Sequence, residues 1–144
     1  MRFFFYGTLL DRDVMALVLG RRLPPQAFVP ASLPGHARRR AKGASYPIVI
    51  PDPRREAEGA VVEGLSRRDV DRLIAYEGPG YRIAPLRVRA KGTLIEVAVF
   101  EPLQARLQPA DETWQLALWQ RHHKRTFVTR LRRAFSVRPA YSRP

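Results

Sequence analysis

Apolar residues at the start of the chain predict a buried strand that is followed directly by a helix. Arg2–Tyr6 is an almost entirely apolar run that ends at Gly7, which is typical of a strand covered on both faces. Asp11 is a good N-cap for a helix over Arg12–Leu19, and Gly20 is a suitable stop for that helix. The first segment is therefore expected to be a strand, a glycine turn and a helix.

Two further strands are expected in the middle of the chain. Tyr46–Ile50 is apolar and is closed by Pro51-Asp52-Pro53. Proline cannot donate to a strand ladder, so this strand is expected at an edge. Ala60–Leu65 is the second of these strands, and the rest of the proline-rich stretch between residues 24 and 53 gives no clear pattern.

A second helix is marked by its N-terminal sequence. Ser66 followed by Asp69 is the pattern of a capping box, in which each side chain accepts a backbone N–H of the other residue. The apolar positions that follow share one face, which predicts a helix over Arg67–Tyr76.

The remaining pattern predicts a hairpin and a long C-terminal helix. Leu86–Ala90 alternates apolar and basic residues, and Gly92 turns the chain into a strand over Leu94–Phe100. After Pro109, apolar residues recur every three or four positions, at Leu116, Trp119, His123, Phe127 and Leu131. Several strands with few helices indicate an α+β protein with a small, curved or barrel-like sheet.

The composition is that of one folded domain. The 144 residues are about the size of a single domain, which we assign to residues 1–135, with a basic tail over residues 136–144. No run approaches the roughly 20 apolar residues of a membrane span, and the N-terminus lacks a signal-peptide pattern. We therefore expect a cytoplasmic protein that does not enter a membrane. The absence of cysteine excludes disulfides, thiolate nucleophiles and cysteine-bound metal.

A formal net charge of +13 introduces a second class of function. Basic residues neutralise phosphates and supply most of the non-specific affinity for nucleic acids. They cluster at Arg38–Arg40 with Lys42, and again over Arg121–Pro144, which has eight basic residues and no acid. A solvated basic surface is the simpler interpretation. A basic, non-catalytic module that binds nucleic acid or an acidic partner is the alternative to an enzyme.

Two short segments carry the candidate chemistry. Phe3–Leu10 is a strand that breaks into a glycine turn, a geometry that exposes backbone N–H groups to an anion. Tyr76–Arg82 ends the predicted helix on Glu77, which stands between aromatic residues and glycines. The negative end of the helix dipole disfavours the ionised carboxylate by about 0.3 to 1 kcal/mol, which helps a base but does not make one alone. Together the segments indicate an enzyme, although Glu77 taken alone fits a surface residue ahead of a turn.

Four motifs spread along the chain match those of a known family. They are Tyr6-Gly7-Thr8-Leu9, Tyr46-Pro47-Ile48-Val49, Val62-Glu63-Gly64-Leu65, and Leu73 with Tyr76-Glu77-Gly78 and Tyr81-Arg82. A tryptophan-rich segment, Trp114–Phe127, follows them. In these features the chain resembles the γ-glutamylcyclotransferase-like superfamily, in its plant avirulence-induced-gene branch, over most of its length.

This resemblance implies both a fold and a reaction. The fold is a small closed β-barrel of about five to seven mainly antiparallel strands with surrounding helices. The implied activity is that of a γ-glutamylcyclotransferase, a carbon–nitrogen lyase formerly classed as an acyltransferase, which converts a γ-glutamyl amine, amino acid or peptide into 5-oxoproline and a free amine. The substrate's own α-amino group attacks its γ-carbonyl, so the enzyme needs no nucleophile of its own. A small γ-glutamyl substrate is the implied partner, and no cofactor or metal is expected.

The same resemblance assigns the site residues. Glu77 is the catalytic residue, and it acts as general acid and base. The turn after the first strand is expected to bind the substrate's α-carboxylate or the oxyanion at the γ-carbonyl. Tyr81 and Arg82 belong to the substrate-binding set, with core packing of Tyr81 and a structural ion pair of Arg82 as the alternatives. The residues of the turn are Tyr6, Gly7, Thr8 and Leu9.

Other residues with chemical potential are given structural roles. His122 and His123 project about 100° apart on a helix, so they do not chelate one metal, and His123 is expected to pack in the apolar stripe. Glu63 is expected in a cross-strand ion pair rather than as a second acid. Phe100 stands where many members of the family that the chain resembles carry a tyrosine, and this difference bears on which substrate fits.

Overall fold

The structure is a computed structural model that describes residues 1–103 and 108–137, and this part of the chain contains six strands and four α-helices. The strands are β1 (Phe3–Phe5), β2 (Val29–Ala41), β3 (Pro47–Val62), β4 (Tyr81–Ala90), β5 (Thr93–Pro102) and β6 (Pro109–Thr113). The helices are α1 (Arg12–Leu19), α2 (Arg67–Glu77), α3 (Leu116–His122) and α4 (Lys124–Val137).

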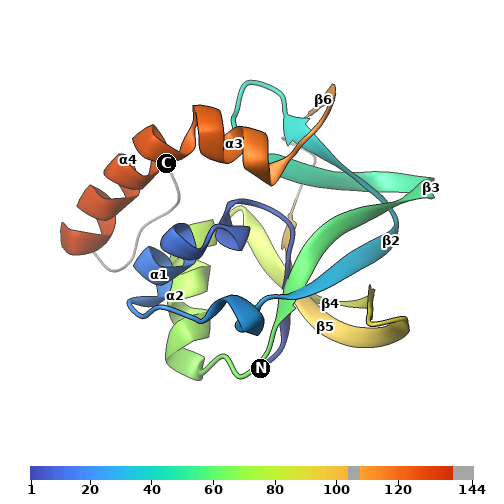
Figure 1. Ribbon diagram of the computed structural model, residues 1–144, viewed down its shortest axis with the longest axis horizontal. Coiled ribbons are helices and arrows are strands. Elements are labelled where there is room, and N and C mark those ends of the chain that lie inside the picture. The colour runs from blue at the N-terminus through green and yellow to red at the C-terminus, as the bar shows by residue number, and fades with distance from the viewer. Residues whose placement is uncertain (104–107, 138–144) are drawn as a thin grey trace.

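Five of the strands close into a barrel. β1 pairs with β3 in antiparallel fashion and with β5 in parallel, while β4 joins β5 to β2. The long pairing between β2 and β3 completes the ring, and β6 extends the sheet beside β2 (Figure 1). The structure confirms the expected closed α+β barrel with mainly antiparallel strands.

Alternation along β1 divides the apolar residues between two cores. Phe4 packs inside the barrel with residues of the other four barrel strands, among them Leu33, Val61, Val88 and Val97. Phe3 and Phe5 face the opposite way, into a larger core between the barrel and the helices. Successive side chains of a strand point to opposite faces, so a strand that is apolar throughout serves both cores.

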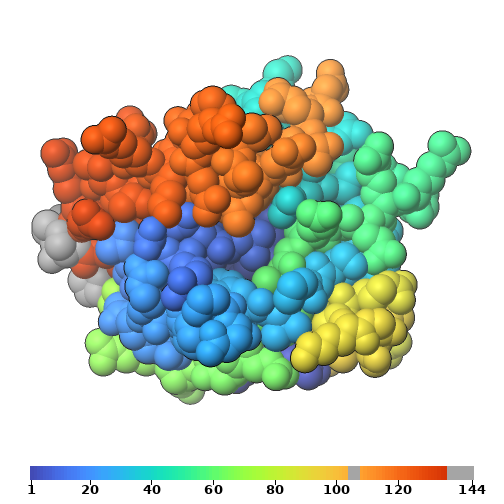
Figure 2. Space-filling view, viewed as in Figure 1, coloured from blue at the N-terminus to red at the C-terminus, as the bar shows by residue number. Residues whose placement is uncertain are grey.

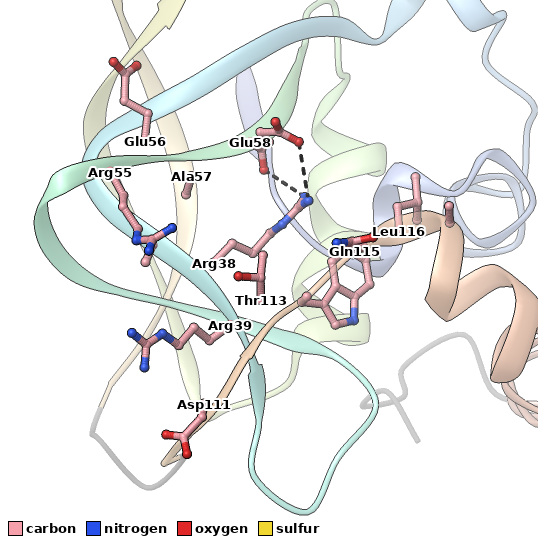
Figure 3. A pocket seen from close by; sticks show the side chains of 13 residues that line it. Arg38, Arg39, Arg55, Glu56, Ala57, Glu58, Asp111, Thr113, Gln115 and Leu116 are labelled. Carbon is pink, nitrogen blue, oxygen red and sulfur yellow. Dashed lines mark hydrogen bonds and ion pairs between the residues drawn. The ribbon is translucent and has the colours of Figure 1, made fainter.

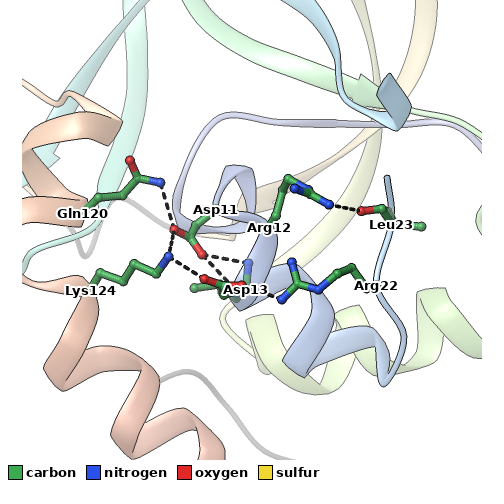
Figure 4. Close-up of polar contacts among 8 residues, drawn as sticks. Asp11, Arg12, Asp13, Arg22, Leu23, Gln120 and Lys124 are labelled. Carbon is green, nitrogen blue, oxygen red and sulfur yellow. Dashed lines mark hydrogen bonds and ion pairs between the residues drawn. The ribbon is translucent and has the colours of Figure 1, made fainter. Parts of the chain in front are cut away.

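The helices gather on one side of the barrel and are tied to α1 by a polar network. Asp11 caps α1 by accepting the N–H groups of Asp13 and Val14, and its carboxylate also contacts Lys124 at 2.9 Å and Gln120 at 2.9 Å (Figure 4). This network joins the start of α1 to α3 and α4, which lie across the N-terminal segment in the space-filling view (Figure 2).

Several helices and strands lie where the local sequence pattern predicts them. α1 spans the predicted residues, and α2 begins at the predicted capping box between Ser66 and Asp69. The hairpin of β4 and β5 turns at Lys91 and Gly92, which both have positive φ. These elements are specified by contacts between residues close in sequence.

Two separate middle strands were expected, and this prediction is wrong. Tyr46–Ile50 lies almost entirely within the continuous strand β3, whereas Ala60–Leu65 overlaps only the last three residues of that strand. β3 pairs with β2 over Pro47–Pro51 and over Glu56–Val61. A register shift opposite Pro34 and His36 accommodates the prolines of β3. Among the described residues, the proline-rich start of β3 pairs with β2 alone, whereas its end pairs with both β2 and β1. The edge position expected for Tyr46–Ile50 agrees with these pairings.

The C-terminal region also differs from the prediction. The residues after Pro109 first form β6, and the expected single helix is divided into α3 and α4 at His123. His123 is exposed rather than packed, because its φ of −128° takes it out of the helix. α4 continues to Val137, and the rest of the expected basic tail lies outside the described residues. None of the described helices is long and apolar enough to cross a bilayer.

Candidate functional site

The turn after β1 is a short 3-10 helix over Thr8–Leu10. The N–H groups of Leu10 and Asp11 donate to the carbonyls of Gly7 and Thr8, both at 3.0 Å. The first donor within the turn is Leu10, so the turn itself leaves the N–H groups of Thr8 and Leu9 for other acceptors. These two N–H groups are the backbone donors that the turn could offer to an anion.

The start of α1 does not provide this anion site. Its first N–H groups donate to the Asp11 carboxylate at 2.9 and 3.0 Å, and a bound anion would have to displace that cap. An anion in this region would therefore have to be bound by the turn rather than by the start of α1.

Gly7 is explained by space rather than by unusual backbone angles. Its φ of −129° is accessible to any residue, but a Cβ at this position would lie 3.2 Å from Cγ of Pro47. Pro47 is the first residue of β3 and is buried. Glycine therefore allows the turn to approach the strand that forms one wall of the site.

Glu77 is brought to this turn by the end of α2. It is the last residue of the helix, and Gly78, whose φ of 82° with ψ of −179° favours glycine, ends α2 and leads the chain towards β4. Glu77 is half-buried and lines a small cavity, which we call the site cavity. Its other walls are Phe4, Phe5, Tyr6, Gly7, Thr8, Leu9, Pro47 and Phe100.

The turn and the helix end are connected by a buried hydrogen bond. Oγ1 of Thr8 lies 2.8 Å from the hydroxyl of Tyr76, and both side chains are almost fully buried. Tyr76 directly precedes Glu77, so this contact holds the acid close to the turn. The sequence motifs contain both residues, but nothing in their spacing predicts that they meet.

The site cavity is small. It encloses about 30 Å³, which is the space of one water molecule. A ligand larger than a water molecule would therefore have to extend beyond the cavity or displace a wall side chain. Pro47, which the motif Tyr46-Pro47 contains but to which the sequence assigned no role, is one of those walls.

Two predicted binding residues lie outside the lining of the site cavity. Arg82 is exposed and forms an ion pair with Glu101 of the neighbouring strand at 2.6 Å. Tyr81 is half-buried and packs against the core between barrel and helices. These contacts are the ion pair and the core packing that were weighed as alternatives. Glu63, the other acid considered, is exposed and pairs with Arg2 at 3.3 Å, as expected.

A larger cavity of about 660 Å³ lies between the hairpin of β2 and β3 and the segment Asp111–Ala117 (Figure 3). Its charged residues are mixed in sign, with Arg38, Arg39 and Arg55 near Glu56, Glu58 and Asp111. Such a lining favours no single class of charged ligand, so this cavity is not our candidate for the chemistry.

Arg38 lines this larger cavity and also contacts the backbone of Tyr6, which lines the site cavity. Its guanidinium donates to the carbonyls of Glu58 at 2.9 Å and Tyr6 at 3.4 Å, and it lies over the ring of Trp114. Burial lowers the pKa of Arg38, against the opposing charge of Glu58. Arg40 pairs with Glu112 at 2.6 Å. Two of the three arginines in the predicted basic cluster are thus used for internal contacts.

The comparison with known proteins agrees with the geometry of the fold. Residues 3–120, which include the turn and Glu77, match the family described as gamma-glutamyl cyclotransferase, AIG2-like. The chain belongs to this family. AIG2-like protein A of Arabidopsis thaliana is 31% identical over 127 residues, which are 87% of this chain and 75% of that protein.

Solved structures resemble the chain along nearly its whole length. The solution structure of an Arabidopsis thaliana protein has a TM-score of 0.62 and 27% identity, and the likeness covers 94% of this chain and 91% of that one. A structure described as gamma-glutamyl cyclotransferase has a TM-score of 0.60 at 16% identity, over 90% of this chain and 85% of that one. At that identity the second likeness supports the fold alone.

Proposed function

We propose that this member of the family is a γ-glutamylcyclotransferase that converts a γ-glutamyl amine, amino acid or peptide into 5-oxoproline and a free amine. The observation that carries the proposal is the site cavity, whose lining includes both Glu77 and the turn Tyr6–Leu9. An acid–base group and backbone donors are the two components that this cyclisation needs.

The reaction is intramolecular in the substrate. The α-nitrogen forms a bond to the γ-carbonyl carbon, and the bond from that carbon to the leaving nitrogen breaks. Starting from the α-ammonium, the attacking nitrogen gives up two protons and the leaving nitrogen gains two. Glu77 is placed to take each proton from the first nitrogen and to deliver it to the second.

The turn supplies orientation and charge stabilisation. N–H groups of Thr8 and Leu9 would receive the oxyanion that forms on the γ-carbonyl or the substrate's α-carboxylate. Oriented intramolecular attack is worth roughly 7 to 11 kcal/mol relative to a bimolecular encounter, and the covalent tether of the substrate supplies part of this gain, so the site contributes by holding the substrate folded. The main work of the site is therefore positioning, with one carboxylate for proton transfer.

Release of 5-oxoproline from a panel of γ-glutamyl amines, amino acids and peptides tests the proposal. We expect Glu77→Gln to lower the rate of 5-oxoproline release at least 100-fold, because general acid–base catalysis raises reaction rates by about 10²- to 10⁴-fold. Glu63→Gln is the matched control, because Glu63 is exposed and lies outside the site cavity, and its rate should stay within a factor of about two. Equal rates for wild type and a folded Glu77→Gln variant would refute the role of Glu77.

A further inference from the structure

A second cavity adjoins the site cavity across the side chains of Tyr6 and Phe100. It has a volume of about 140 Å³, and these two residues line both cavities. The hydroxyl of Tyr6 donates to the carbonyl of Phe100 at 3.4 Å, which is long for a hydrogen bond. A ligand that occupied both spaces would have to displace the half-buried Tyr6 side chain and break this bond.

The walls of the second cavity are mostly apolar and come from four strands. They include Leu33 of β2, Val49 of β3, Leu86 of β4 and Val99 of β5. All four belong to the core inside the barrel or pack against it. We call this space the barrel-end cavity, because it lies where the parallel strands β1 and β5 both end.

Two polar side chains of the barrel-end cavity make contacts with neighbouring residues. Nδ1 of His36 lies 2.9 Å from the carbonyl of Pro34, and Glu101 is paired with Arg82. A ligand with an ammonium group here would have to compete with Arg82 for Glu101. Burial of a charge without a partner is strongly unfavourable, so an uncharged chain suits this cavity better.

The size of the cavity limits the chain that it can hold. Apolar cavities of about 150 Å³ are large enough to bind benzene, and one water-sized group takes about 30 Å³. The barrel-end cavity, at about 140 Å³, therefore has room for between about four and about five groups of that size.

We propose that the barrel-end cavity binds the leaving amine of the substrate and selects γ-glutamyl amides of apolar amines with a chain of about four carbons. This inference rests on the proposed function, because it assigns the leaving amine to the cavity that shares Tyr6 and Phe100 with the cavity of Glu77. Tyr6 would then lie beside the bond between the γ-glutamyl part and the amine.

A series of γ-glutamyl n-alkylamides tests the selectivity. From the methylamide to the n-butylamide, kcat/KM for 5-oxoproline release should rise up to about fourfold per methylene, which corresponds to about 0.8 kcal/mol. The octylamide should bring no further gain, because the cavity is then full. The amide of 1,4-diaminobutane, which ends in an ammonium group, should be at least tenfold poorer than the butylamide.

A cavity-filling variant and a matched control localise the effect. Leu86→Phe should reduce the ratio of kcat/KM between the butylamide and the methylamide to near one. Ile83→Phe is the control, because Ile83 is on the same strand but is exposed and lines neither cavity. This variant should keep the wild-type ratio of kcat/KM between the two amides. An unchanged ratio in a folded Leu86→Phe variant would contradict the proposal.

Calorimetric binding to the Glu77→Gln variant separates the inference from the proposed function, since it requires no turnover. The butylamide should bind at least tenfold more tightly than the methylamide. Equal affinities, or tighter binding of the diaminobutane amide, would overturn the assignment of the cavity whether or not the wild type is active. If the wild type released no 5-oxoproline from any substrate but the tighter binding held, the proposed function would fail and the cavity assignment would stand.

Discussion

The hydroxyl of Tyr76 lies 2.8 Å from Oγ1 of Thr8, so the residue before the candidate acid is hydrogen-bonded to the turn that faces that acid. Both side chains are almost fully buried. A buried hydrogen bond that joins two separate segments restricts their relative position, and here it sets the distance between Glu77 and the backbone donors of the turn.

Tyr76→Phe should therefore affect both stability and activity. The ring would still pack, but Thr8 would lose a buried partner, which costs about 1 to 3 kcal/mol in the free energy of unfolding. Looser placement of Glu77 should lower kcat by about 10- to 100-fold. Urea unfolding and 5-oxoproline release measure the two effects. In the double variant with Thr8→Val, the loss in the free energy of unfolding should be smaller than the sum of the losses in the two single variants. A loss equal to that sum would show that the contact does not couple the two segments.

Gly7→Ala should impair the site with little loss of stability. The added Cβ would lie 3.2 Å from Pro47, which must then shift by a few tenths of an ångström and narrow the site cavity. We expect a higher KM and a lower kcat, measured by 5-oxoproline release. Gly80→Ala is the control, because no atom lies within 4 Å of its added Cβ. Wild-type kinetics for Gly7→Ala would mean that the approach of Pro47 does not shape the site.

Stability should fall in acid through the ion pairs of Asp13. Hydrogen bonds from Lys124, and then from Arg22, lower the pKa of Asp13 from 3.8 to about 2. The folded state thus binds this proton less readily than the unfolded chain, and the stabilisation is present above pH 3.8 and lost as the pH falls towards 2. Chemical unfolding measured across this interval should show the loss.

Lys124→Met identifies the source of that pH dependence. The variant should be less stable than wild type near neutral pH, and the difference should shrink as Asp13 becomes protonated. The hydrogen bond to Asp13 also raises the pKa of Lys124 from 10.5. The contribution of Lys124 to the free energy of unfolding is therefore fully present below pH 10.5 and declines at higher pH. Arg125→Met is the control, because Arg125 is exposed on the same helix. A constant difference between wild type and Lys124→Met from neutral pH to pH 2 would contradict the assignment.

The parts of the fold that could be read from the sequence are those decided by neighbouring residues. Asp11 accepts backbone N–H groups two and three positions further on, and the capping box of Ser66 and Asp69 has the same short range. Both helix starts were predicted correctly. The strand β2 was missed, because its prolines and its bulge near Pro34 are compatible with a strand only when β3 lies beside it.

The same division applies to the candidate site. A strand end, a glycine and a helix end are local features that drew attention to the turn at Tyr6–Leu9 and to Glu77, and the resemblance to a family then assigned their roles. The tertiary structure decided that these segments share one cavity and that Tyr81 and Arg82 lie outside its lining. It also placed Pro47 and Phe100 in the walls of that cavity. The physical reason is barrel closure: the strands that supply these walls are far apart in the chain, and only their hydrogen-bonded pairing brings the walls together.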